Sequence, residues 1–180
     1  MDKKDTQLVK IFDKNGDLRG YKPRAEINKT KDIVSTIHVF VIKDDKLILS
    51  KIPANGHVFT GKIGSTFATM ERKGDEDEIV SVQRAIKDDL DLEQLPDGIS
   101  TPRIICDKFF YEGGKLTRFF KGYYIETTKP LVSAGSSCNI ELVCFQVEQI
   151  TDKIENKPDL FAPSLLSVWE HMNTDFITQP

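Results

Sequence analysis

Residues 71–93 read ERKGDEDEIVSVQRAIKDDLDLE, a glycine-containing turn followed by an acidic amphipathic stretch. Apolar residues recur in it at three- and four-residue spacing, namely Ile79, Val82, Ile86 and Leu90. That spacing is typical of a helix with one apolar face, so we predict a helix over residues 76–91. The pair Gly74-Asp75 is the predicted turn that feeds this helix.

The same helix carries two adjacent acids with an arginine nearby. If the apolar face packs on a sheet, Asp88 and Asp89 fall on one flank, together with Ala85, and Arg84 lies toward solvent. Two carboxylates suit a hard cation that keeps coordination positions for water and phosphate oxygens. Acid pairs are also common on solvated helix faces, and this alternative stays open. Glu78 is not a further ligand, because it lies about 15 Å along the axis from Asp88.

The segments on either side of this helix predict a sheet. Residues 7–27 form two short strand-like runs around Asn15-Gly16, a pair typical of tight hairpin turns. The letters DKNGD also resemble the start of a calcium loop, but Leu18 stands where that loop needs glycine. Two alternating, β-branched runs joined by Asp44-Asp45 predict a second hairpin at the centre of the sheet. His38 lies in the first run, and we expect it to be a packed residue.

The C-terminal half adds three more predicted elements. Aromatic-rich runs around Gly113-Gly114 predict a third hairpin, IELVCFQVEQI predicts a last strand, and a helix is expected from about Pro163. The resulting order of strands, helix, strands and helix favours a mixed β-sheet with a helix on each face, in the α/β (α+β) class. We expect one domain over residues 1–180, with a hairpin over 7–27 and a core over 33–180.

Composition excludes several classes of function. The net charge of -3 and the near balance of acids and bases give no basic surface for duplex nucleic acid. There is no apolar run of about 20 residues for a membrane span and no apolar signal-peptide core at the start of the chain, so we expect a cytoplasmic protein. Cys106, Cys138 and Cys144 lack metal-site spacing and are expected to be reduced thiols.

The order of elements around the acidic helix resembles the Nudix hydrolases. Their box reads G-x5-E-x7-R-E-U-x-E-E-x-G-U, where U is a bulky apolar residue. Its second half corresponds to residues 84–92 here, in which Arg84, Ile86 and Leu92 match and Asp88 and Asp89 are shorter versions of two glutamates. Its earlier Gly-Glu corresponds to Gly74 with Asp75 or Glu76.

The resemblance is to a degenerate box. Ala85 stands where the family has another glutamate that acts as metal ligand or base, and Asp91 replaces the box glycine. The N-terminal half is most similar to the isopentenyl-diphosphate isomerase branch. The catalytic cysteine of that branch would fall near Ile63 or Gly64, so we do not expect isomerase chemistry.

The resemblance implies an α/β/α sandwich that hydrolyses a nucleoside-diphosphate-linked or other diphosphate small molecule with Mg²⁺ or Mn²⁺ and water. In this reading Asp88, Asp89 and the carbonyl of Gly64 hold the metal ion. Arg84 orients the acids by pairing with Asp75 or Glu76. Because Ala85 supplies no base, the resemblance implies a base from outside the box, for which Glu141 and Glu112 are candidates.

Two basic residues flank the loop that leads into the helix. Lys62 and Arg72 are the residues we place nearest a substrate phosphate, with ordinary surface charge as the alternative. A second function stays open, a catalytically inactive Nudix domain that binds a nucleotide or a protein. Ala85 favours it, and the aromatic hairpin could stack on a base, although alternating aromatics are also typical of a sheet core. The resemblance leaves a homodimer open, through the N-terminal hairpin or a sheet edge.

Overall fold

The computed structural model describes residues 6–53, 59–75, 77–90, 97–113, 116–131 and 141–172. Its strands are β1 (Leu8–Phe12), β2 (Leu18–Pro23), β3 (Val34–Lys43), β4 (Lys46–Lys51), β5 (Ile63–Gly64), β6 (Phe67–Met70), β7 (Arg103–Gly113), β8 (Leu116–Glu126) and β9 (Glu141–Gln146). Its α-helices are α1 (Glu78–Leu90), α2 (Val147–Asn156) and α3 (Pro163–Glu170), with 3₁₀ turns η1 (Arg24–Glu26) and η2 (Pro158–Leu160).

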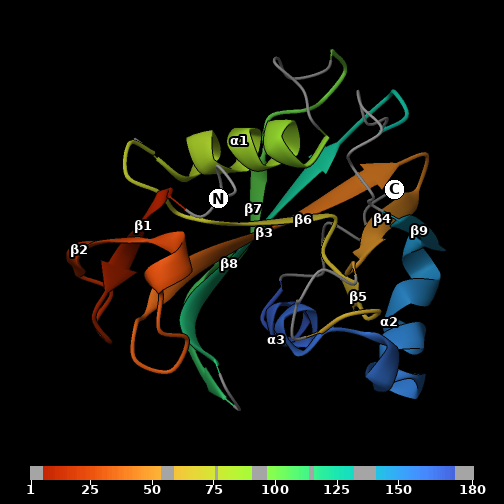
Figure 1. Ribbon diagram of the computed structural model, residues 1–180. Coiled ribbons are helices and arrows are strands. Elements are labelled where there is room, and N and C mark those ends of the chain that lie inside the picture. Colours follow the sequence, from red (N-terminus) through yellow and green to blue (C-terminus); the bar gives the residue numbers. More distant parts are fainter. Residues whose placement is uncertain are drawn as a thin grey trace.

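A seven-stranded mixed sheet forms the centre of the molecule. Its strand order is β5-β4-β3-β8-β7, with β6 also paired to β3 and β9 also paired to β4. The pairing of β3 with β8 is parallel, and the other pairings are antiparallel. Helix α1 covers one face, whereas α2 and α3 lie on the other (Figure 1). The predicted fold class, a mixed sheet with helices on both faces, is confirmed.

Strand β3 divides the core into two layers because successive side chains point to opposite faces. Ile37, Val39 and Val41 face α1, where Val82 and Ile86 pack on them. On the other face Phe40 packs with residues of β8, α2 and α3, including Phe120, Ile150, Leu165 and Trp169. All but two of the ten β3 residues are buried, including the polar Ser35, Thr36 and His38, because both faces of this strand are covered.

Helix α1 is present, but its buried face differs from the predicted stripe. Ser81, Val82, Ala85 and Ile86 are buried, whereas Ile79 is 38% exposed. Ile79 lies in the first turn, at the margin of the surface that packs on β3 and β6. The side chain of Leu90 lies outside the described residues. Ala85, which was predicted on one flank with the two acids, instead belongs to the face that packs on the sheet.

The N-terminal hairpin of β1 and β2 is confirmed and is joined to the sheet by backbone hydrogen bonds. Lys10 N–H donates to the Glu71 carbonyl at 3.0 Å, and Lys73 N–H donates to the Leu8 carbonyl at 2.8 Å. The turn has Gly16 at φ +90°, and the Asp13 side chain accepts from the Asn15 and Asp17 amides. The hairpin therefore lies against the segment that leads from β6 into α1.

Two other predicted turns have different outcomes. Asp44 and Asp45 both have positive φ and join β3 to β4, so that hairpin is confirmed. Strands β7 and β8 pair as predicted, but Gly114 lies outside the described residues.

The predicted last strand was too long at its C-terminal end. Strand β9 ends at Gln146, and α2 begins at Val147. The apolar residues Val147, Ile150 and Ile154 follow helical spacing and are buried, which a strand could not achieve. Helix α3 begins at Pro163 as predicted.

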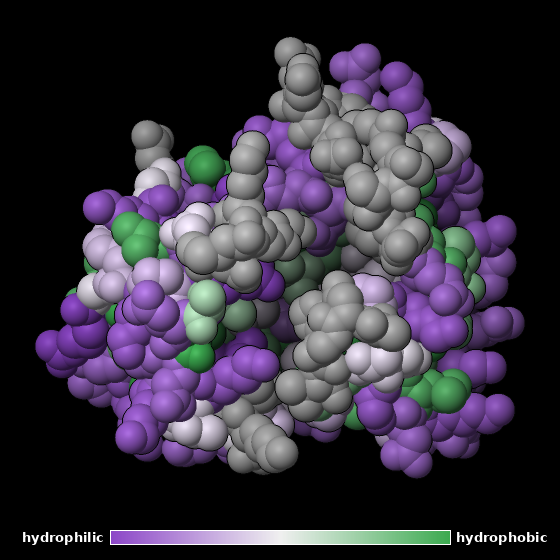
Figure 2. Space-filling view, viewed as in Figure 1, coloured by the Kyte–Doolittle hydropathy of each residue, from purple (hydrophilic) through white to green (hydrophobic). Residues whose placement is uncertain are grey.

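Large apolar side chains at the surface are scattered. The exposed ones are Leu8, Leu18, Tyr21, Ile79, Ile104 and Leu160. The coloured part of the face in Figure 2 is mostly hydrophilic, with separate hydrophobic residues. Among the described residues, no helix is both long and apolar enough to cross a membrane.

Candidate active site

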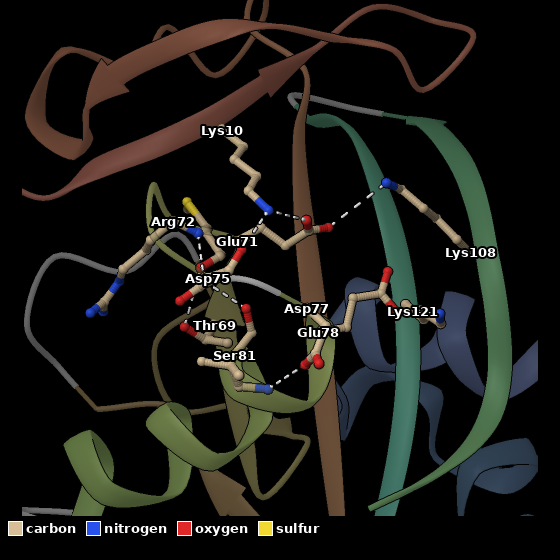
Figure 3. Close-up of polar contacts among 12 residues, drawn as sticks. Lys10, Thr69, Glu71, Arg72, Asp75, Asp77, Glu78, Ser81, Lys108 and Lys121 are labelled. Atoms are coloured by element: carbon tan, nitrogen blue, oxygen red, sulfur yellow. Dashed lines mark hydrogen bonds and ion pairs between the residues drawn. The ribbon is translucent and has the colours of Figure 1, made fainter.

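The turn before α1 is held to the helix by Asp75. Arg84 donates to this carboxylate twice, from Nε to Oδ1 at 3.2 Å and from Nη2 to Oδ2 at 2.7 Å. Ser81 Oγ and the backbone N–H of Arg72 also donate to Oδ2, at 2.6 and 2.7 Å. Figure 3 shows Asp75 between Arg72 and Ser81, with Thr69 of β6 beside them. The structure thus contains the expected Arg84–Asp75 pair; the alternative partner, Glu76, lies outside the described residues.

Arg84 uses its whole guanidinium group in this arrangement. Besides Asp75, it donates from Nη1 to Thr69 Oγ1 at 2.9 Å and from Nη2 to the Met70 carbonyl at 3.1 Å. Helix α1, strand β6 and the turn are therefore joined by one side chain, and the prediction that Arg84 lies toward solvent was wrong.

The electrostatics of Asp75 follow from these contacts. Burial by itself raises the pKa of a carboxyl group, but the hydrogen bonds from Arg84, Ser81 and Arg72 outweigh it. They hold the Asp75 pKa below its ordinary value of 3.8. Asp75 is therefore ionised near neutral pH and serves as a fixed anchor for the helix.

The adjacent acids lie on the last turns of α1, one turn beyond Arg84. Asp88 Oδ2 is 3.1 Å from Arg72 Nη1 and 3.9 Å from Arg84 Nη1. The Asp88 side chain is one-third exposed, whereas that of Arg72 is 13% exposed. Asp89 is half-buried and also has an interaction partner. Two predicted site residues, Asp88 and Arg72, therefore lie in direct contact.

The donor chemistry of this turn fits a divalent cation only in part. Consecutive carboxylates are hard oxygen ligands, and Mg²⁺ is commonly held by one or two carboxylates together with water and substrate phosphate. Among the residues that the structure describes, no cluster of three or more His, Cys, Asp or Glu side chains could hold a metal ion. Ala85, one turn before these acids, is buried. Asp88 and Asp89 thus offer two hard oxygen donors, which is fewer than a closed metal site supplies.

Three other predicted site residues have their contacts elsewhere. Gly64 of β5 pairs with Ser50 of β4, whereas α1 packs on β6 and β3. Lys62 Nζ donates to the Asp159 carbonyl at 2.9 Å, next to α3. Glu141, on β9, forms an exposed ion pair with Lys51 at 3.2 Å. No polar contact within the described segments joins any of these residues to Arg84 or Asp88.

Several charged residues beside the site were not predicted. Glu71 is buried and lies 3.5 Å from Lys10 Nζ and 3.8 Å from Lys108 Nζ. Glu78, in the first turn of α1, pairs with Lys121 and accepts from the Tyr123 hydroxyl at 2.6 Å. Figure 3 shows these groups between the hairpin, α1 and β8. Their partners come from distant segments, so no local pattern in the sequence signals them.

His38 is buried on the opposite face of the sheet. Ser65 Oγ donates to the Phe67 carbonyl, so it accepts from His38 Nδ1 at 2.9 Å. The His38 ring also contacts Phe120 edge-on. Burial, with a smaller effect of the nearby Arg118 charge, lowers the pKa of His38 from 6.5 to about 3. The ring is therefore neutral near pH 7, in a packed position.

These elements define the fold of the Nudix hydrolases. DR0079 from Deinococcus radiodurans superposes with a TM-score of 0.63 at 14% identity, over 83% of this chain and 90% of that one. An ADP compounds hydrolase superposes with a TM-score of 0.54 at 17% identity, over 89% of this chain and 80% of that one. The Nudix hydrolase RenU from M. smegmatis superposes with a TM-score of 0.51 at 13% identity, over 95% of this chain and 97% of that one. No protein-family model and no curated protein sequence matches the chain.

Proposed function

We propose that the protein is a Nudix-type hydrolase that cleaves a nucleoside-diphosphate-linked or other diphosphate small molecule with Mg²⁺ or Mn²⁺ and water. The proposal rests mainly on one structural observation. The consecutive acids Asp88 and Asp89 lie on a helix that the Arg84–Asp75 pair fixes against β6, in a Nudix fold. A neighbour in fold is called an ADP compounds hydrolase, which supports a diphosphate substrate.

The residues take distinct roles in this proposal. Asp88 and Asp89 would hold the cation, which supplies charge for the diphosphate and lowers the pKa of the attacking water. Arg84 and Asp75 position α1, and Arg72 meets a phosphate. Gly64, Lys62 and Glu141 take part only if ligand binding changes their present contacts.

A degenerate Nudix box and a sequence similarity to the isopentenyl-diphosphate isomerase branch are part of the same proposal. They rest on the sequence of the N-terminal half and on residues 74–92, where Ala85 replaces a glutamate. Loss of one carboxylate weakens cation binding, so we expect slow turnover.

A second function, ligand binding without hydrolysis, is favoured by a separate observation. Ala85 is buried, and Asp88 is paired with arginine instead of being open to a cation. In this version the protein is an inactive Nudix domain that binds a nucleotide or a protein.

One experiment separates the two functions. The protein is incubated with a panel of nucleoside-diphosphate compounds and Mg²⁺ or Mn²⁺, and phosphate or monophosphate release is measured. Turnover that Asp89→Ala abolishes, and that Asp97→Ala on an exposed loop leaves intact, supports the hydrolase. Thermal stabilisation by a nucleotide without product supports the binder. A panel with neither effect rejects both for these ligands.

We also propose a cytoplasmic location without nucleic-acid or membrane partners. Homodimerisation through the hairpin or a sheet edge stays a prediction, which sedimentation of the purified protein tests.

A further inference from the structure

The two arginines of the site differ in how fully they are used. Arg84 donates from Nε, Nη1 and Nη2 to Asp75, Thr69 and the Met70 carbonyl. The Arg72 guanidinium has one carboxylate partner among the described residues, Asp88, through Nη1. A guanidinium carries five N–H donors, so Arg72 has donors to spare. Arg84 is fixed, whereas Arg72 can exchange its partner.

The backbone of Arg72 stays in place during such an exchange. Its N–H donates to Asp75 Oδ2, and the residue forms a bridge with Val9 of β1. Only the long side chain has to move, and it ends beside an acid that is one-third exposed. The Arg72 side chain is itself 13% exposed, so the guanidinium lies just below the surface, next to an acid that solvent reaches.

Charge and shape favour a diphosphate over Asp88 as the partner of Arg72. Arg84 lies 3.9 Å from Asp88 but has its closer pairing with Asp75, at 2.7 Å. Asp88 is therefore the carboxylate that balances Arg72 in the free protein. A diphosphate offers more charge than one carboxylate and matches the planar fork of arginine.

We propose that Arg72 is an exchangeable counter-ion of Asp88, which pairs with this acid in the free protein and moves to the phosphate oxygens when a diphosphate binds. The transfer leaves the Asp88 carboxylate available to the divalent cation. Metal and diphosphate therefore bind with positive cooperativity, and the free protein binds the metal weakly. This inference rests on the diphosphate ligand of the proposed function, but it does not require hydrolysis.

Arg72→Gln is the decisive variant because we expect it to change the affinity for the metal ion and the affinity for the diphosphate in opposite directions. Manganese alone, titrated by electron paramagnetic resonance, binds the variant about tenfold more tightly than the wild type, because the competing charge is gone. A methylene-bridged nucleoside diphosphate, titrated calorimetrically in EDTA, binds about tenfold more weakly. Lys73→Gln is the matched control: it removes a charge next in sequence whose side chain lies over Tyr21, and it changes neither affinity.

A second variant tests the same exchange from the side of the acid. Asp88→Asn frees Arg72, so we expect tighter binding of the methylene-bridged diphosphate in EDTA and weaker binding of manganese. Unchanged manganese affinity in Arg72→Gln overturns the inference, as does unchanged diphosphate affinity, or a wild type that binds neither probe. Opposite shifts without turnover support the exchange and reject the hydrolase. Turnover without these shifts supports the hydrolase and overturns the exchange.

Discussion

Asp75 and Arg84 are nine positions apart in sequence, yet two hydrogen bonds join their side chains, at 3.2 and 2.7 Å. Both side chains are largely buried, with 7% and 17% exposed. The same guanidinium reaches β6, so this pair fixes the direction of α1 relative to the sheet. The position of Asp88 and Asp89 depends on that direction.

Replacement of Arg84 should destabilise the protein. Arg84→Met leaves the Asp75 carboxylate buried without its ion pair, so we expect the free energy of unfolding to fall by about 3 kcal/mol. Arg84→Lys recovers only part of this loss, because one ammonium group cannot reach Asp75, Thr69 and Met70 together. Urea denaturation measures both variants. A loss below about 1 kcal/mol for Arg84→Met contradicts the buried pair.

The lowered pKa of Asp75 predicts that the stability of the protein depends on pH in the acid range. Its pKa is lowered in the folded protein, so its contribution is complete above the ordinary value of 3.8 and is lost as the pH falls below it. We expect Asp75→Asn to be less stable than the wild type at pH 6. The difference should narrow as the pH is lowered to 3, in urea denaturation at each pH. A constant difference would show that Asp75 acts through packing alone.

The lowered pKa of His38 predicts a second pH dependence of stability, which begins at higher pH. The folded protein keeps this ring neutral, with a pKa of about 3, whereas the unfolded chain takes up the proton near 6.5. Stability contributed by the neutral ring is therefore present above pH 6.5 and is lost toward pH 3, at up to about 1.4 kcal/mol per pH unit. His38→Phe, which keeps an aromatic ring beside Phe120, should remove this slope between pH 6.5 and 4.5. An equal slope in both proteins rejects the assignment.

Glu71 should fix the N-terminal hairpin to the core. Glu71→Ala leaves Lys10 and Lys108 without their shared buried acid, so we expect a loss of about 3 kcal/mol and faster hydrogen exchange of the β1 amides. Glu112→Ala is the control, since its ion pair with Lys14 is exposed on both sides and contributes less than about 1 kcal/mol. Similar exchange rates in the two variants would count against this role.

Part of the candidate site could be predicted from sequence because it is local. Arg84 and Asp88 are four residues apart on a helix, and the turn at Asp75 directly precedes it. The spacing of a helix brings such residues together whatever else the chain does. The pair of acids, Asp88 and Asp89, was predicted for the same reason.

Tertiary structure decided the rest. The pairing of Arg72 with Asp88 depends on how the turn after β6 folds over α1, and the buried Glu71 depends on β1 and β7, which lie far away in sequence. Lys62 and Glu141 were predicted to reach the site from other segments, but the fold places them beside Asp159 and Lys51.

The sequence by itself determined several of the elements, because hydrophobic period and turn residues act over a few positions. It determined β3, the helical α1 and the hairpin turns at Gly16 and Asp44-Asp45. Only the tertiary structure decided that Ala85 is buried and that Asp88 meets a guanidinium. Both facts depend on the angle at which a helix packs on a sheet, and that angle is set by side chains from several distant strands.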